Sequence, residues 1–229
     1  MPRFRKLKSQ VLSVLESPEW ENKLESLLSF PPKQVIGALC SCLHHPPEIK
    51  WHAVTAFGML VPRMADENMG DARTVMNRFV WNIEKDSSST GWGIPESMGE
   101  VMACQALLAM EFHKHLISYI QSPDCRGSNY IEQSTLRQGA YWGLGRLSEA
   151  RPELVAEAAP VLLQAIPKEE STSKGLICWI LGLLQITQAK SVLEELISAT
   201  SKIELYRDRM LAKTTVGELA KQALEAVKA

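Results

Sequence analysis

Apolar residues recur every three to four positions along most of this chain, which is the spacing of one face of an amphipathic helix. Three segments share a finer pattern, in which a basic residue is followed by small or apolar residues at intervals of three and then by a glycine. These segments are residues 49–60, 136–147 and 173–184, with glycines at Gly58, Gly145 and Gly182. Two further copies are residues 99–110 and 216–227, with Leu108 and Glu225 at the glycine position.

The copies begin roughly 40 residues apart, which is the period of two-helix solenoid repeats. A second helical pattern accompanies each copy, in residues 32–43, 72–83, 110–120, 152–166 and 189–200. One helix pair cannot bury its apolar face alone, so successive pairs must stack into a continuous core. The pattern therefore predicts an all-α fold, an α-α solenoid of about five helix pairs, in a single domain over residues 1–229.

The repeat signature resembles HEAT repeats, in particular the short bacterial type found in phycocyanobilin-lyase-like proteins. The resemblance extends over roughly residues 31–227, and the basic position is occupied by Lys50, Arg137 and Lys174. Glu100 and Gly217 depart from it, so we expect the second and fifth repeats to pack differently. The stretches "GWGIPESMGE" and "YWGLGRL" are also similar to a group of bacterial HEAT-repeat proteins. This resemblance implies an armadillo-like fold but no activity.

One segment near the C-terminus, residues 203–220, lacks helical spacing. Apolar residues on both sides of the polar turn at 207–209 predict a small β-hairpin before the last helix. We expect Thr214 or Thr215 to cap that helix, with Glu218 in its first turn. Because terminal solenoid repeats need a polar outer face, we expect the hairpin to cover the apolar end of the stack.

The resemblance places the second helix of each pair on the concave side, and helical geometry then selects the positions that face away from the core. These positions include Trp51, Gln105, Trp142 and Trp179. Exposed aromatic surface marks interaction sites, and Trp is enriched at binding hot spots. Packing between repeats is the alternative for these tryptophans, and the sequence leaves it open. Arg146, four residues after Trp142, shares its face and completes a candidate anchor pair.

The stretch "SSSTGWGIPESMGEV", residues 87–101, interrupts the helical pattern. Pro95 suits the first turn of a helix, and Glu96 and Glu100 share one face of that helix. The stretch therefore joins an outer helix to the concave helix of the second repeat, with Trp92 between two glycines. Either Trp92 fills a gap between repeats or the loop folds over the groove as a lid. In the second case Trp92, Glu96 and Glu100 belong to the binding surface.

Composition and charge narrow the possible partners. A net charge of −1 provides few phosphate contacts, so we do not expect nucleic acid as a partner. The sequence has no apolar run long enough to cross a membrane and no signal-peptide pattern, so we expect a cytoplasmic protein. Five irregularly placed cysteines do not form a disulfide framework. Because zinc-ligand spacings, phosphate-binding loops and nucleophile motifs are all lacking, we expect no metal, no cofactor and no catalytic residue.

These features favour a non-enzymatic protein- or peptide-binding scaffold that uses the concave groove of the solenoid. The alternative is a catalytic HEAT-like protein, similar either to the alkylpurine DNA glycosylases or to bilin lyases. The charge of the groove discriminates between them, because a DNA-handling protein needs a continuous basic lining. The acidic residues near the predicted groove argue against such a lining; they are Glu96, Glu100, Glu149 and Glu218.

Overall fold

The structure, a computed structural model, describes residues 2–85 and 91–228. The N-terminal half contains α1 (Pro2–Leu15), α2 (Trp20–Lys23), η1 (Leu24–Ser29), α3 (Pro32–Cys42), α4 (Pro47–Lys85), α5 (Ile94–Cys104) and α6 (Ala106–Ser118). The C-terminal half contains α7 (Ser134–Ala150), α8 (Pro152–Val155), η2 (Ala156–Ala158), α9 (Ala159–Ala165), α10 (Ser171–Leu183), η3 (Thr187–Ala189), α11 (Lys190–Leu196), β1 (Lys202–Arg207), β2 (Met210–Thr215) and α12 (Val216–Lys228). The predicted helical fold with one hairpin before the last helix is confirmed.

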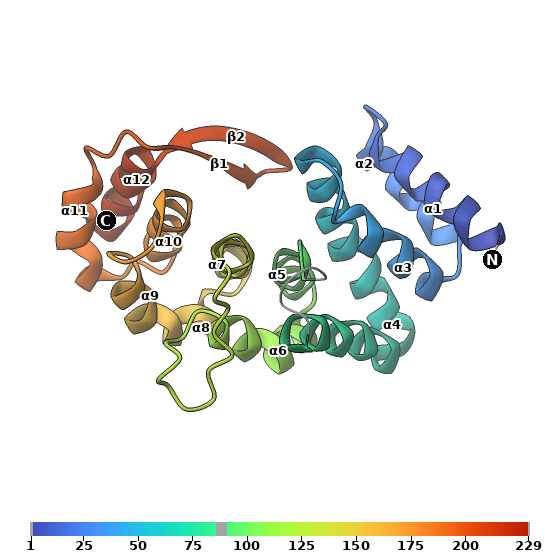
Figure 1. Ribbon diagram of the computed structural model, residues 1–229, viewed down its shortest axis with the longest axis horizontal. Coiled ribbons are helices and arrows are strands. Elements are labelled where there is room, and N and C mark those ends of the chain that lie inside the picture. Colours follow the sequence, from blue (N-terminus) through green and yellow to red (C-terminus); the bar gives the residue numbers. More distant parts are fainter. Residues whose placement is uncertain (1, 86–90, 229) are drawn as a thin grey trace.

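The helices form two layers along an arc (Figure 1). The inner layer contains the first half of α4 together with α5, α7, α10 and α12, and consecutive members of this layer pack against one another. The outer layer contains α3, the second half of α4, α6, α8, α9 and α11. Apolar side chains between the layers form one continuous core, as expected of stacked helix pairs. Within the described ranges, none of the helices has the length and apolar character needed to span a bilayer.

The long helix α4 is two helices divided at Asn68, whose φ of −154° and ψ of 101° are not helical. The Asn68 side chain accepts a hydrogen bond from the backbone N–H of Gly70, so a local turn replaces the helical hydrogen bonds there. Phe57 in the first half and Phe79 in the second half pack edge to face, with ring centroids 5.2 Å apart. The two halves therefore act as separate helices, in agreement with the separate patterns at 49–60 and 72–83.

The second repeat differs from the predicted alignment. Helix α5 begins at Ile94, after Gly93 in the left-handed conformation (φ 72°), and it ends at Cys104 rather than continuing through Leu108. Gln105 is extended, and its side-chain oxygen accepts hydrogen bonds from the N–H groups of Leu107 and Leu108. The predicted groove residue Gln105 is therefore the N-cap of the outer helix α6. Because Gln105 caps α6, helix α5 ends at Cys104, whereas the repeat alignment extended it through Leu108.

Glycines bring α5 and α7 unusually close. A Cβ atom on Gly99 would lie 2.3 Å from the Cα of Gly143, so neither residue has room for a side chain. A Cβ atom on Gly139 would likewise meet the carboxylate of Glu96, at 2.4 Å from Oε2. These glycines, of which Gly143 occupies a small position of the repeat, therefore set the distance between the two inner helices and make room for the Glu96 side chain of α5.

The hairpin is a two-residue β-hairpin in which Arg207 pairs with Met210. Asp208 and Arg209 have φ values of 51° and 61°, the left-handed conformation that suits such tight turns. At its far end Thr215 caps α12, because its hydroxyl accepts from the N–H of Glu218 while the Glu218 carboxylate accepts from the N–H of Thr215. The predicted cap is confirmed.

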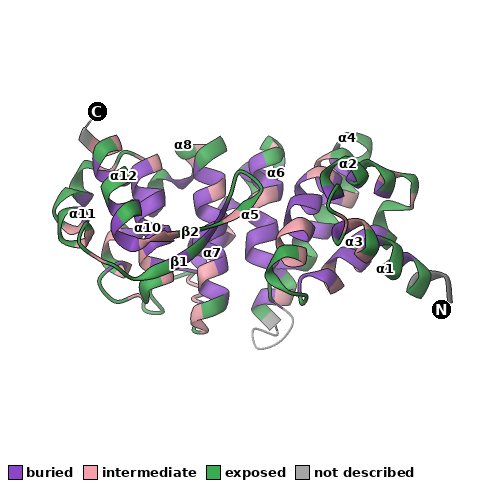
Figure 2. Ribbon diagram, turned by 90° about the horizontal axis from the view of Figure 1, so that it is seen from above, coloured by how far each residue is buried: buried purple, intermediate pink, exposed green. Residues whose placement is uncertain are grey.

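The position of the hairpin was not predicted correctly. It does not cover the end of the stack, where α11 and α12 lie, but extends across the concave side toward the start of α4 (Figures 1 and 2). Ile203 of β1 packs over Gly175 of α10, where a Cβ atom would come within 2.3 Å of it. At the hairpin turn Arg209 pairs with Glu21 near the other end of the chain. The hairpin thus connects the two ends of the arc.

Candidate functional site

The tip of the hairpin is held by an aromatic cluster on the concave helices. The Tyr206 ring stacks on Trp51 with centroids 4.7 Å apart and planes inclined by 6°. Its hydroxyl lies 2.9 Å from the hydroxyl of Thr55. The indole Nε1 of Trp142 donates to the backbone carbonyl of Tyr206. These contacts join helices α4 and α7 through a hairpin residue, and burial raises the pKa of the Tyr206 phenol to about 12.

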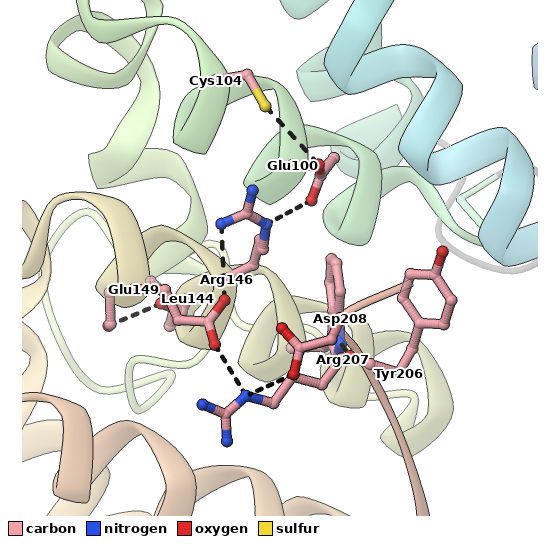
Figure 3. A network of polar contacts seen from close by, with 10 residues as sticks. Glu100, Cys104, Leu144, Arg146, Glu149, Tyr206, Arg207 and Asp208 are labelled. Atoms are coloured by element: carbon pink, nitrogen blue, oxygen red, sulfur yellow. Dashed lines mark hydrogen bonds and ion pairs between the residues drawn. The ribbon is translucent and has the colours of Figure 1, made fainter. Parts of the chain in front are cut away.

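A polar network lies on one side of this cluster (Figure 3). Arg146 donates to Glu100 at 2.7 Å and approaches Glu149 at 3.6 Å, while Arg207 from the hairpin reaches Glu149 at 3.2 Å. Desolvation nevertheless raises the pKa of Glu149, although the two arginines act in the opposite direction. Desolvation also raises the pKa of the Cys104 thiol to about 11, and the Glu100 charge adds to this shift. Cys104 is therefore protonated at neutral pH and is a poor nucleophile.

A cavity of about 660 Å³ lies on the other side of the cluster, between the hairpin and the first turns of the inner helices. Its lining combines indole rings with aliphatic, hydroxyl, amide and charged groups. The lining residues are Leu43, His44, His45, Pro47, Lys50, Trp51, Trp92, Glu96, Thr135, Gln138, Gly139, Trp142, Thr172, Leu176, Glu204 and Leu211. A concave, largely apolar cavity with a few polar groups is the usual form of a binding site.

The charged pair of this cavity is Lys50 and Glu96. The Lys50 ammonium donates to Oε1 of Glu96, and it also lies 4.7 Å from the centroid of the Trp51 ring. Oε2 of Glu96 is buried and has no hydrogen-bond partner among the described residues. This carboxylate, on a residue that lines the cavity, therefore carries one buried acceptor without a donor.

Two of the predicted groove tryptophans are not exposed. Trp142 is 4% exposed because the hairpin covers it, and Trp179 is 5% exposed. A Cβ atom on Gly145 would lie 2.2 Å from the Trp179 ring, so this indole fills the space between α7 and α10. Of the two alternatives that the sequence leaves open, packing between repeats applies to Trp179, while Trp142 is covered by the hairpin, so neither indole faces solvent.

The remaining predicted residues occupy different places. Trp51 and Trp92 both line the cavity, and Trp92 is 37% exposed rather than filling the core. Glu96 and Glu100 share one face of α5 as expected, but Glu96 lies at the cavity and Glu100 in the polar network on the other side of the aromatic cluster. Glu96 pairs with Lys50, and Glu100 pairs with Arg146. Arg146 is engaged by the carboxylates of Glu100 and Glu149. Residues 86–90 of the predicted lid lie outside the described residues.

Sequence reasoning missed Tyr206, and it assigned Lys50 only to the repeat pattern. Tyr206 lies on a strand beside the turn, and apolar residues at that position are common in hairpins, so it did not stand out as a site residue. One indication was present in the sequence. Several tryptophans occupy positions that should face solvent on the concave helices, and such large aromatic side chains usually pack against another surface, which an aromatic residue such as Tyr206 can supply. Among the described residues, no cluster of three or more metal-ligating side chains occurs.

Comparisons with known proteins define the fold only. No family model matches the chain, and no curated protein matches its sequence. Two engineered proteins solved by the Northeast Structural Genomics Consortium superpose with TM-scores of 0.53 and 0.54 at 16% identity, covering 97% of this chain and 96% and 98% of theirs. A designed armadillo repeat protein superposes with a TM-score of 0.50 at 14% identity, covering 95% of this chain and 98% of its own. The protein therefore has an armadillo-like helical repeat fold.

Proposed function

We propose that this protein is a non-enzymatic binding module that holds a segment of a partner protein in the cavity between its concave helices and its hairpin. We further propose that the fold consists of about five HEAT-like helix pairs of the bacterial type and that the protein acts in the cytoplasm. The observation that carries it is the cavity itself, which the hairpin closes on one side and which Trp51, Trp92 and Trp142 help to line.

The size and lining of the cavity support a short segment rather than a folded domain. Its volume of about 660 Å³ is typical of sites that enclose a small ligand or a few side chains. Indole rings provide large contact areas at low entropic cost, and Trp is frequent among the residues that dominate binding energies. The half-exposed Trp92 and the amide of Gln138 provide contacts at the opening.

The charges of the lining favour a protein segment over duplex DNA. Duplex DNA is the partner expected if the protein were instead similar to the DNA glycosylases. Lys50 is the only lysine or arginine among the described lining residues, and it already pairs with Glu96. DNA affinity comes largely from phosphate neutralisation by several basic groups. Submicromolar duplex binding that survives about 0.2 M salt would favour the catalytic alternative.

Site-specific photo-crosslinking in the native lysate tests the proposal. A photoreactive residue is placed at Gln138 in the cavity and, as a matched control, at the exposed Gln188, which is not among the lining residues. We expect a partner protein to crosslink from position 138 and not from position 188, and Trp92→Ala to reduce the yield. Equal crosslinking from both positions, or no protein adduct from position 138, would contradict a partner segment in the cavity.

A further inference from the structure

Resting on that proposed function, we propose that the partner segment inserts an arginine side chain into the cavity, with its guanidinium donating to Glu96. Three independent observations lead to this group: an unused buried acceptor, the net charge of the lining, and the indole walls.

The unused acceptor is Oε2 of Glu96. Only 6% of the Glu96 side chain is exposed, and Lys50 donates to its other oxygen. Gly139 leaves the space that Oε2 occupies, since a Cβ atom there would lie 2.4 Å from it. A buried carboxylate oxygen without a donor retains an uncompensated desolvation cost. An N–H group from a ligand would remove this cost without displacing a hydrogen bond from another residue.

The charge of the lining favours a cation. Its ionised groups are Lys50, Glu96 and Glu204, so with His44 and His45 counted as neutral the lining carries a net negative charge. The first turns of α5 and α7 also border the cavity, and helix N-termini by themselves favour anions. An anion would however meet Glu96 and Glu204, whereas a cation would balance their excess charge.

The indole rings distinguish arginine from lysine. Lys50 already lies over the Trp51 ring, which shows that this wall accepts a cation. A guanidinium is planar and weakly hydrated, so it can stack on Trp92 while its edge donates to the carboxylate. A second ammonium would have to lose a strongly held hydration shell in the same space.

The test compares three probes, N-acetylarginine amide, N-acetylcitrulline amide and N-acetylnorleucine amide, by NMR titration of the full-length protein. Citrulline keeps the planar shape of arginine but carries no charge, because a carbonyl oxygen replaces one guanidinium nitrogen and only some of the N–H donors remain. Norleucine has neither the charge nor any side-chain N–H group. The indole N–H signals of Trp51, Trp92 and Trp142 report on the cavity, while those of Trp20 and Trp81 lie outside its lining. We expect arginine amide to bind roughly fivefold to tenfold more tightly than citrulline amide, because charge assistance strengthens the contact.

Variants assign that preference to Glu96. Glu96→Gln should abolish the difference between arginine and citrulline amides, whereas Glu100→Gln, at a partly buried glutamate on the same helix that also pairs with a basic residue, should preserve it. Equal binding of arginine and citrulline amides to the wild-type protein would overturn the cationic group, even if Glu96→Gln failed to fold. Failure of arginine amide to shift the cavity indoles at millimolar concentration would do so too. The crosslinking from Gln138 decides separately whether a partner segment occupies the cavity.

Discussion

The indole Nε1 of Trp142 on α7 donates a 2.8 Å hydrogen bond to the backbone carbonyl of Tyr206, which lies 64 residues later in the hairpin. This bond satisfies a buried indole N–H that would otherwise face an aromatic surface. It also fixes the depth at which the hairpin sits over the concave helices. The cavity on one side and the polar network on the other are both defined by this contact.

The hydroxyl pair at the hairpin tip gives the first prediction. Tyr206→Phe and Thr55→Val should each lower the free energy of unfolding by about 1 kcal/mol, because each removes one buried hydrogen bond. In the double variant the two losses should not add, since the same bond is removed once. Urea unfolding of the four proteins measures this coupling, and strictly additive losses would show that the two hydroxyls do not interact.

The two tryptophans at the cavity should differ in their effect on stability. Trp142→Ala removes a buried ring and should cost about 3 to 5 kcal/mol. Trp92→Ala removes a side chain that is 37% exposed and should cost less than about 1 kcal/mol, as surface substitutions do. Thermal melts of both variants beside the wild type make the comparison. A large loss in Trp92→Ala would identify its segment as a structural joint rather than part of a binding surface.

The glycines between α5 and α7 should also behave unequally. In Gly99→Ala the new methyl group meets the backbone of Gly143, so the helices must move apart, and we expect a loss of about 3 kcal/mol or more. In Gly139→Ala the obstructing group is the flexible carboxylate of Glu96, so the loss should be smaller. Chemical denaturation ranks the two variants, and a larger loss for Gly139→Ala would contradict the close backbone contact.

The raised pKa of Glu149 predicts a particular pH dependence. Because the folded-state pKa lies above the unfolded value, Glu149 stabilises the fold most at low pH and loses this contribution as pH rises through the raised pKa. The unfolding free energy of Glu149→Gln relative to wild type should therefore increase from about pH 4 to about pH 7. A decrease over the same range would mean that its ion pairs with Arg146 and Arg207 outweigh desolvation.

Glu111 supplies a control of opposite sign. Hydrogen bonds from Arg73 lower its pKa, so its contribution is present above the unfolded value and is lost as pH falls through the lowered one. Glu111→Gln should therefore lose stability relative to wild type as pH rises from about 3 to about 5. Measuring both variants by denaturant unfolding at several pH values separates a site effect from a general one.

Local patterns were sufficient for much of the fold and insufficient for the site. The helical periodicity, the Arg-Asp-Arg turn and the Thr215 cap each depend on residues within a few positions, and all were predicted correctly. The end of α5 was missed because Gln105 caps the next helix with its side chain, a role that glutamine seldom has. The sequence indicated only that the exposed-type tryptophans needed a partner surface; that Tyr206 supplies it was not predicted, because its contacts with Trp51 and Trp142 depend on the curvature of the arc.

The contact between Thr55 and Tyr206 spans 151 residues, and it changes how this molecule should fold. An ordinary repeat array behaves as a one-dimensional chain in which each unit senses only its neighbours, so terminal units can fray or be deleted. Here the hairpin of β1 and β2, near the C-terminus, packs against α4, the first inner helix. This contact closes the array into a ring. Because so long a loop closes slowly, folding should depend less on local contacts than in an open array. Unfolding of one end of the array should also be coupled to unfolding of the other end.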